Sequence, residues 1–405
     1  MRSRANDYEI SVFLVVALLP PLLAAAVFWV LPIGDLGADR TAMAARDYSD
    51  MWAAGRLVAL GKVNTLFDIE IFNAELRSMF GAGFTHQVWP YPPPTLLLAV
   101  PLSALPLFTG FLLYTAATIG SLWLALRSSG LTVAASAIVL LSPAVAHNAL
   151  VGQNGSLIAA ILFGGLSLVP RRAIMGGAIL GALIIKPQFG LLLPLCLAAS
   201  GNWRAMFAMA TSSGVLILAS VLSFGVEPWI GFFVHTQSMI AAILKAPWEA
   251  LPAQQIFAST FMAARSLGAS LELAWGLQIA VAILCAIVAW SIWQRQNDVD
   301  PLVRAALTGL LAVAAAPWAH SYDMVLLSVA VVVLIRTAHR TLWFLLGFAW
   351  LWPGAVDVMS VPLALSVTSV VSVAWLGWHE LGRVDPSRNQ VRMVGLLSQG
   401  RQFES

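Results

Sequence analysis

Carboxylates that could act as a base are concentrated in one early part of the chain. Residues 31–77 hold seven of them, namely Asp35, Asp39, Asp47, Asp50, Asp68, Glu70 and Glu75. The next acidic residue is Glu227, so a base drawn from this group has few competitors. Asp47 and Asp50 stand apart because the aromatic residues Tyr48 and Trp52 flank them near a predicted membrane boundary. We therefore take these two aspartates as candidate proton acceptors.

A second set of polar residues lies at the ends of apolar segments. It combines hydroxyls, amides, cations and one carboxylate: Tyr91, Gln153, Asn154, Lys186, His320, Tyr322 and Asp323. Ionisable groups near membrane depth are costly and are functional candidates by default. Lys186 alone could extend to the interface, and His320 alone could be a packing residue. Their predicted convergence on one side favours a phosphate site, where His320 could be protonated because the phosphate would be its partner. The set suits an enzyme whose substrate is a lipid bearing a phosphate and a polar head group.

The composition fixes the broad class of the protein. Of 405 residues, 60% are hydrophobic and 10% are charged, with a mean hydropathy of +0.84. Soluble domains carry about 25% charged residues, so this chain is an integral membrane protein with several spans. The net charge of +3 comes without a basic patch, and no nucleic-acid partner is expected. Cys196 and Cys285 lie in apolar runs and are expected to pack.

The chain is predicted to be an all-α membrane protein, a single membrane domain over residues 1–405 with about twelve spans. The candidate spans are 11–30, 108–127, 131–147, 156–170, 173–186, 189–200, 205–224, 270–293, 304–316, 323–336, 341–353 and 361–379. Several are shorter than the ~20 residues of a straight crossing, so they must be buried, tilted or broken. Residues 95–104 are interpreted as a half-inserted segment that ends at Pro106.

The distribution of Lys and Arg predicts the orientation, because cytoplasmic loops are enriched in them. This rule places 31–93 and 225–268 outside as the first and second extracytoplasmic loops, and 383–405 inside as a cytoplasmic tail. The candidate site residues then all face the outside.

Two helices are expected in the first loop. One starts near Ser49 or Asp50 and stops at Gly61, which would leave Asp47 just before the helix. Asp50 would lie in the first turn, where the helix dipole lowers its basicity. The other helix, 68–80, has an apolar face suited to the membrane surface.

Motifs for common cofactors are absent from the sequence. There is no HExxH spacing and no phosphate-binding glycine loop, so neither a metal nor another cofactor is predicted. Asp47, Asp50 and Asp323 could hold a metal only if the fold brought them together.

An ordered set of short motifs resembles glycosyltransferase family 87, of the C-type membrane glycosyltransferase superfamily (GT-C). The set is Asp47-Tyr48, Trp52-x-Ala54-Gly55-Arg56, Tyr91-Pro92-Pro93, Gly152-Gln153-Asn154, Lys186-Pro187 and Pro317-Trp318-x-His320-x-Tyr322-Asp323. The resemblance covers about residues 40–330. Its best-known members are mannosyltransferases that use polyprenyl-phosphate mannose on the outer face of the membrane.

The resemblance implies a GT-C fold and an inverting transfer in a bacterial plasma membrane. The partners implied are a polyprenyl-phosphate sugar donor, a glycolipid or glycan acceptor, and membrane lipids, with no nucleotide sugar. Asp47 would be the general base, and the substrate-binding residues would be Asp50, Trp52, Arg56, Tyr91, Gln153, Asn154, Lys186, His320, Tyr322 and Asp323.

The sequence departs from the family pattern in ways that leave alternatives open. The family often has Asp-Phe where this chain has Asp47-Tyr48, and Asp50 remains a second candidate base. The segments beyond Asp357 match no known pattern. A transporter or flippase for the same lipid is the rival function, because broken spans with buried charges also occur in transporters. A scaffold in polysaccharide assembly is the third.

Overall fold

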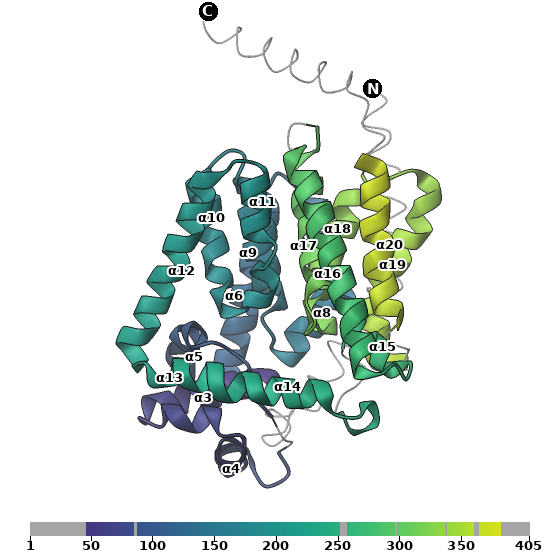
Figure 1. Ribbon diagram of the computed structural model, residues 1–405. Helices are drawn as coiled ribbons and strands as arrows, with labels where there is room; N and C mark the ends of the chain where they lie inside the picture. Colours follow the sequence, from purple (N-terminus) through teal and green to yellow (C-terminus); the bar gives the residue numbers. More distant parts are fainter. Residues whose placement is uncertain are drawn as a thin grey trace, which may run out of the picture.

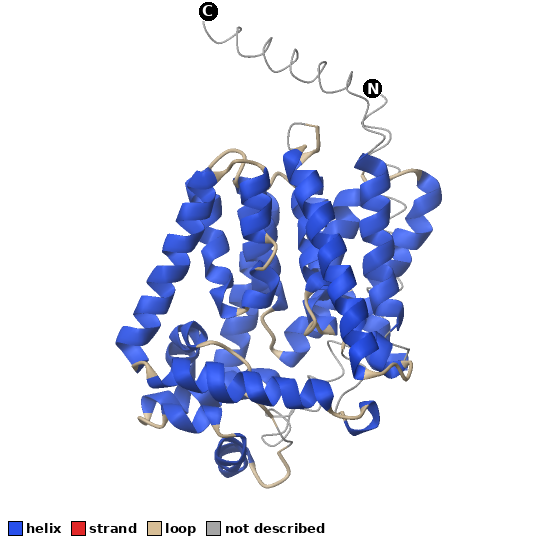
Figure 2. Ribbon diagram, in the orientation of Figure 1, coloured by secondary structure: helices blue, strands red, loops and turns tan. Residues whose placement is uncertain are grey.

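The computed structural model describes residues 46–84, 87–251, 257–295, 298–336, 338–359 and 364–381. Within these ranges the chain is helical and contains no strand, apart from one isolated bridge between Phe257 and His320 (Figure 2). The all-α prediction is therefore confirmed for this part of the chain. The predicted span 11–30 and the tail 383–405 lie outside the described residues.

The first half of the chain alternates α-helices with short 3₁₀ turns. Its elements are α3 (Arg46–Ala59), η1 (Val63–Phe67), α4 (Ile69–Phe80), η2 (Pro93–Thr95), α5 (Leu96–Ser103), α6 (Leu107–Ser128), α7 (Val133–Leu140), α8 (Pro143–Val151), α9 (Gly155–Leu168), α10 (Ala173–Gly181), η3 (Ala182–Ile185), η4 (Pro187–Gly190), α11 (Leu193–Ala199) and α12 (Trp203–Phe224).

The second half continues in the same way and adds one π-helical turn, η5. Its elements are α13 (Glu227–Gly231), η5 (Phe232–Thr236), α14 (Gln237–Lys245), η6 (Trp248–Ala250), α15 (Thr260–Ser266), α16 (Leu271–Gln294), α17 (Pro301–Ala315), η8 (Ser321–Met324), α18 (Val325–Leu334), η9 (Arg340–Leu342), α19 (Trp343–Met359) and α20 (Ala364–Leu381).

These helices form an upright bundle with a layer of helices across one end (Figure 1). The long helices, among them α6, α12, α16 and α17, run roughly side by side, and α3, α4, α5, α13 and α14 gather at the lower end of the view. The α11–α12 and α16–α17 connections lie at the opposite end. Arg204 is the second residue of α12, Arg295 directly follows α16, and Arg304 is in the first turn of α17. The predicted outer loops and these three arginines thus occupy opposite ends of the bundle.

The centre of the bundle is α9, α17 and α18, whose residues are nearly all buried. The outer helix α12 instead exposes large apolar side chains: Trp203, Phe207, Val215, Leu218 and Leu222. An apolar exposed face of this size is expected where lipid is the solvent.

Three described helices, α6, α12 and α16, are long and apolar enough to cross a membrane. The pair α7–α8, bent by 52°, would make a fourth. The count of about twelve spans is therefore not confirmed by length and composition. Helix α5 has only eight residues, in agreement with the interpretation of 95–104 as a segment that does not cross.

Three breaks in the bundle helices create the polar loops of the site. Helix α8 ends at Gly152, which adopts a left-handed conformation (φ 71°), and α9 begins at Gly155. Helix α10 tightens into η3 and stops at Lys186, because Pro187 has no N–H to continue the ladder. Helix α17 ends at Ala315, shortly before Pro317. Each break leaves its flanking polar residues at the same end of the bundle as α3.

Candidate functional site

Helix α3 begins earlier than predicted and changes the setting of both aspartates. It is helical from Arg46, so Asp47 lies in its first turn and Asp50 in the second. The prediction that Asp47 precedes the helix was wrong. The physical reason is packing, since Tyr48 is fully buried against Phe111 and Tyr114 and holds the first turn in place. The helix dipole therefore acts on Asp47, and stabilises its charged form.

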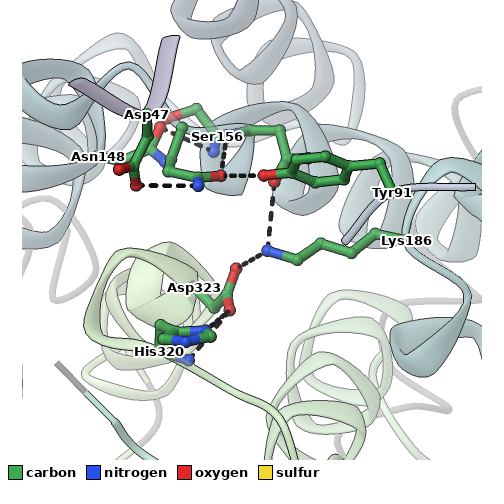
Figure 3. Close-up of polar contacts among 9 residues, drawn as sticks. Asp47, Tyr91, Asn148, Ser156, Lys186, His320 and Asp323 are labelled. Atoms are coloured by element: carbon green, nitrogen blue, oxygen red, sulfur yellow. Dashed lines mark hydrogen bonds and ion pairs between the residues drawn. The ribbon is translucent and has the colours of Figure 1, made fainter. Parts of the chain in front are cut away.

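Asp47 is held by an amide from the break between α8 and α9. Its Oδ2 accepts a hydrogen bond from Gln153 Nε2 at 3.0 Å, and Gln153 Oε1 accepts from the Tyr91 hydroxyl at 2.9 Å (Figure 3). Burial and the negative charge of Asp47 raise the pKa of Tyr91, so its hydroxyl remains a donor. These two hydrogen bonds, from Tyr91 to Gln153 and from Gln153 to Asp47, fix the orientation of the Asp47 carboxylate.

A buried ion pair lies next to this chain. Lys186 Nζ donates to Asp323 Oδ1 at 2.6 Å and to Asn154 Oδ1 at 3.2 Å (Figure 3). The second oxygen of Asp323 accepts from the backbone N–H of His320 at 3.1 Å. The Lys186 and Asp323 side chains are only 6% and 1% exposed. The charge of Lys186 is therefore already compensated inside the protein.

Aromatic rings surround the ammonium of Lys186. It lies 5.0 Å from the ring centre of Tyr322 and 5.3 Å from that of Phe189. His320 stacks on Tyr322 with ring centres 4.9 Å apart, and its Nδ1 lies 3.9 Å from Asp323 Oδ2. Burial, together with the positive charge of Lys186, lowers the pKa of His320 to about 3. Protonation of His320 beside a bound phosphate therefore stays a prediction.

Two adjoining cavities connect these groups. The larger has a volume of about 410 Å³ and is lined by Lys186, His320 and Tyr322 together with residues of α14. The smaller is lined by Asp47, Gln153 and Asn154 and has room for about one water molecule. Tyr91 and Ile185 line both, so the carboxylate of Asp47 lies beside a cavity of ligand size.

The structure leaves four predicted substrate-binding residues outside both cavities: Asp50, Trp52, Arg56 and Asp323, the partner of Lys186. Asp50 is buried, Trp52 donates its indole N–H to the Leu105 carbonyl at 2.8 Å, and Arg56 is exposed with its guanidinium 5.7 Å from the Trp52 ring. These contacts anchor α3. Within the described ranges no group of three acidic, His or Cys side chains could hold a metal, so Asp47, Asp50 and Asp323 do not come together as a metal site.

Sequence reasoning missed the contribution of the second loop. The large cavity is also lined by Gln237 and Lys245 of this loop, neither of which was selected. Residues 225–268 were predicted as a loop, but contain α13, η5, α14 and α15. The apolar spacing of residues 237–245 would have indicated an amphipathic helix. Helix α4, expected on the membrane surface, instead buries Phe72 and Leu76 in a protein core.

A comparison with protein-family models gives one match. The model of glycosyltransferase family 87 matches residues 89–317, more than half of the chain. The chain belongs to glycosyltransferase family 87. The resemblance seen in the sequence is confirmed, and the family supports glycosyltransferase activity in a protein with membrane helices.

The match to glycosyltransferase family 87 covers part of the site. Tyr91, Gln153, Asn154 and Lys186 fall inside the matched range, whereas Asp47 and the segment 320–323 lie outside it. No curated protein and no solved structure matches the chain significantly. The roles of individual site residues therefore depend on the geometry described above.

Proposed function

We propose that this member of glycosyltransferase family 87 transfers a sugar from a polyprenyl phosphate to a hydroxyl of a glycolipid or glycan, with inversion at the anomeric carbon. The observation that carries the proposal is the placement of Asp47 beside the 410 Å³ cavity. Mannose is the sugar that the family resemblance favours. We also propose that the end of the bundle bearing α3 and α14 faces the outside of a bacterial plasma membrane, with the arginine-bearing end in the cytoplasm.

Asp47 is the proposed general base. As the acceptor oxygen attacks the anomeric carbon, its proton passes to the Asp47 carboxylate, and the bond from that carbon to the phosphate oxygen breaks. The Gln153 amide donates to Asp47 Oδ2 at 3.0 Å and so orients the carboxylate. Asp50 lines neither cavity, which supports the choice of Asp47.

The leaving group is a lipid phosphate whose negative charge increases in the transition state. Preorganised donors in a cavity with restricted water stabilise such charge. Lys186 and Tyr322 both line the large cavity, and the Lys186 ammonium lies 5.0 Å from the ring centre of Tyr322. His320, neutral in the unliganded protein, gains a proton only if a phosphate partner compensates for the burial of its charge.

The test compares two matched variants of the purified protein. Asp47→Asn keeps the shape of the side chain but removes the base, and should lower turnover by a factor on the order of 10²–10⁴. Asp50→Asn should lower it far less. The assay supplies polyprenyl-phosphate mannose with acceptor and measures released polyprenyl phosphate. Loss of activity in Asp50→Asn but not in Asp47→Asn would contradict the assignment. Movement of the lipid across vesicles without cleavage would indicate a flippase.

A further inference from the structure

The large cavity is lined by two cations of different character. Lys186 is buried and bonded to Asp323, so it can donate a hydrogen bond to a phosphate without adding net positive charge. Lys245, the last residue of α14, is exposed and has no hydrogen bond or ion pair within the described part of the chain. Lys245 is therefore the cavity cation whose charge remains uncompensated.

Helix α14 presents a single face to the cavity. The residues that line the cavity, Gln237, Ile240, Ala241, Leu244 and Lys245, follow the i, i+3, i+4, i+7, i+8 spacing of one helical face. Polar groups therefore stand at both ends of this face, with an apolar centre between them. Because Lys245 is exposed whereas Lys186 is buried, Lys245 marks the side of the cavity that solvent reaches.

An apolar surface continues from the cavity along α13 and η5. Phe232 lines the cavity, and its ring centre is 5.3 Å from that of the exposed Phe233. Ile230, Phe233 and Val234 are 50%, 63% and 52% exposed. This surface precedes α14, and Lys245 ends that helix, so a ligand that joins an anionic group to a long hydrocarbon chain fits with its anion at Lys245 and its chain along α14 to this surface.

We propose that Lys245 binds the phosphate of a polyprenyl phosphate at the rim of the cavity, with the prenyl chain on the apolar surface of α13 and η5. The sugar then points inward past Tyr91, toward Asp47. This inference rests on the proposed function and extends it with a residue outside the motifs that identified the family. A charge-assisted contact at a partly exposed position should change affinity by about fivefold.

The experiment measures binding of decaprenyl phosphate to the purified full chain in detergent, with decaprenol and inorganic phosphate as the other two ligands. The wild type should bind decaprenyl phosphate more tightly than decaprenol, and inorganic phosphate should compete poorly. Lys245→Gln should lose about fivefold in affinity for decaprenyl phosphate, with no change for decaprenol, and Lys245→Arg should retain the affinity. Arg77→Gln, at an exposed cation on α4 that lines neither cavity, is the matched control and should bind as the wild type.

Each outcome has a defined meaning. Equal binding by Lys245→Gln and the wild type overturns the inference, and so does equal loss in Arg77→Gln. Effective competition by inorganic phosphate overturns the lipid part, because a free anion would then be the ligand. The transfer assay separates this inference from the proposed function. A wild type that transfers sugar alongside an unaffected Lys245→Gln refutes only the inference, and a wild type that shows the Lys245-dependent binding without any transfer refutes only the function.

Discussion

The ion pair between Lys186 and Asp323 gives the sharpest test of the site's electrostatics. Both side chains are almost fully buried and their charged atoms lie 2.6 Å apart. Lys186→Met preserves the length of the side chain and removes its charge. Asp323 is then left in the interior without its cation, although it still accepts from the backbone of His320.

The expected loss of stability in Lys186→Met is large because a buried charge without a partner is unfavourable. Removing one partner of a buried pair costs about 3–5 kcal/mol, since the remaining ion keeps its desolvation penalty. Asp323→Asn should cost less, because Lys186 retains its hydrogen bond to Asn154 and the amide can still accept from His320. The double variant Lys186→Met/Asp323→Asn leaves no uncompensated charge. It should be more stable than Lys186→Met alone, even though it carries one more substitution.

The assay is reversible unfolding in mixed detergent micelles. The free energy of unfolding is measured for the wild type, the two single variants and the double variant, which together form a double-mutant cycle. A coupling energy of about 2 kcal/mol or more supports the ion pair. The reasoning would be refuted if the losses in unfolding free energy of the two single variants summed to that of the double variant within about 0.5 kcal/mol. A Lys186→Met variant as stable as the wild type would refute it too. Activity should remain low in the double variant, because the Lys186 ammonium is still absent.

Two further predictions concern stability. Gly152→Ala should cost about 2–4 kcal/mol in the unfolding assay, because the residue is left-handed and its new Cβ would meet the Tyr48 side chain. Gly201→Ala is its control, since it shares the positive φ but meets no atom, and it should cost only about 1–2 kcal/mol. His320, in the connection between α17 and α18, has a folded pKa of about 3 against 6.5 in the unfolded chain. The unfolded state therefore binds the extra proton between these values, and stability should fall with decreasing pH by about 1.4 kcal/mol per unit. The stability of His320→Gln should lack this contribution to its pH dependence. Identical stability–pH profiles for His320→Gln and the wild type would contradict the assigned contribution of His320.

The sequence predicted the helical class and which polar residues gather, because both depend on local patterns. The breaks at Gly152 and Pro187 are encoded by residue type, and they bring Gln153 and Lys186 to the same end of the bundle. Which of these polar residues form ion pairs could not be predicted from local sequence patterns. Lys186 and Asp323 are 137 residues apart, and no spacing rule relates a cation to a carboxylate over that distance.

The errors have a common physical cause, which is tertiary packing that overrides local signals. Helix α3 extends past its predicted start because Tyr48 is buried against the next helices. Helix α14 was missed because residues 225–268 were assigned to a loop between two apolar spans, and its role became visible only through the cavity that it lines. Trp52 and Arg56 belong to a recognisable motif, yet their contacts anchor α3 outside the cavities.

The separation of Lys186 from Asp323 also matters for the order of biosynthesis. Ribosomes add about 5–20 residues per second, so Asp323 emerges on the order of ten seconds after Lys186. During that interval the lysine is in the nascent chain without its carboxylate. Until α17 and α18 have been synthesised, the Lys186 ammonium therefore stays hydrated or at the membrane interface, and α9 and α10 cannot complete their packing around it. The last central helices to be synthesised would then close the interior around an ion pair whose first half was made long before.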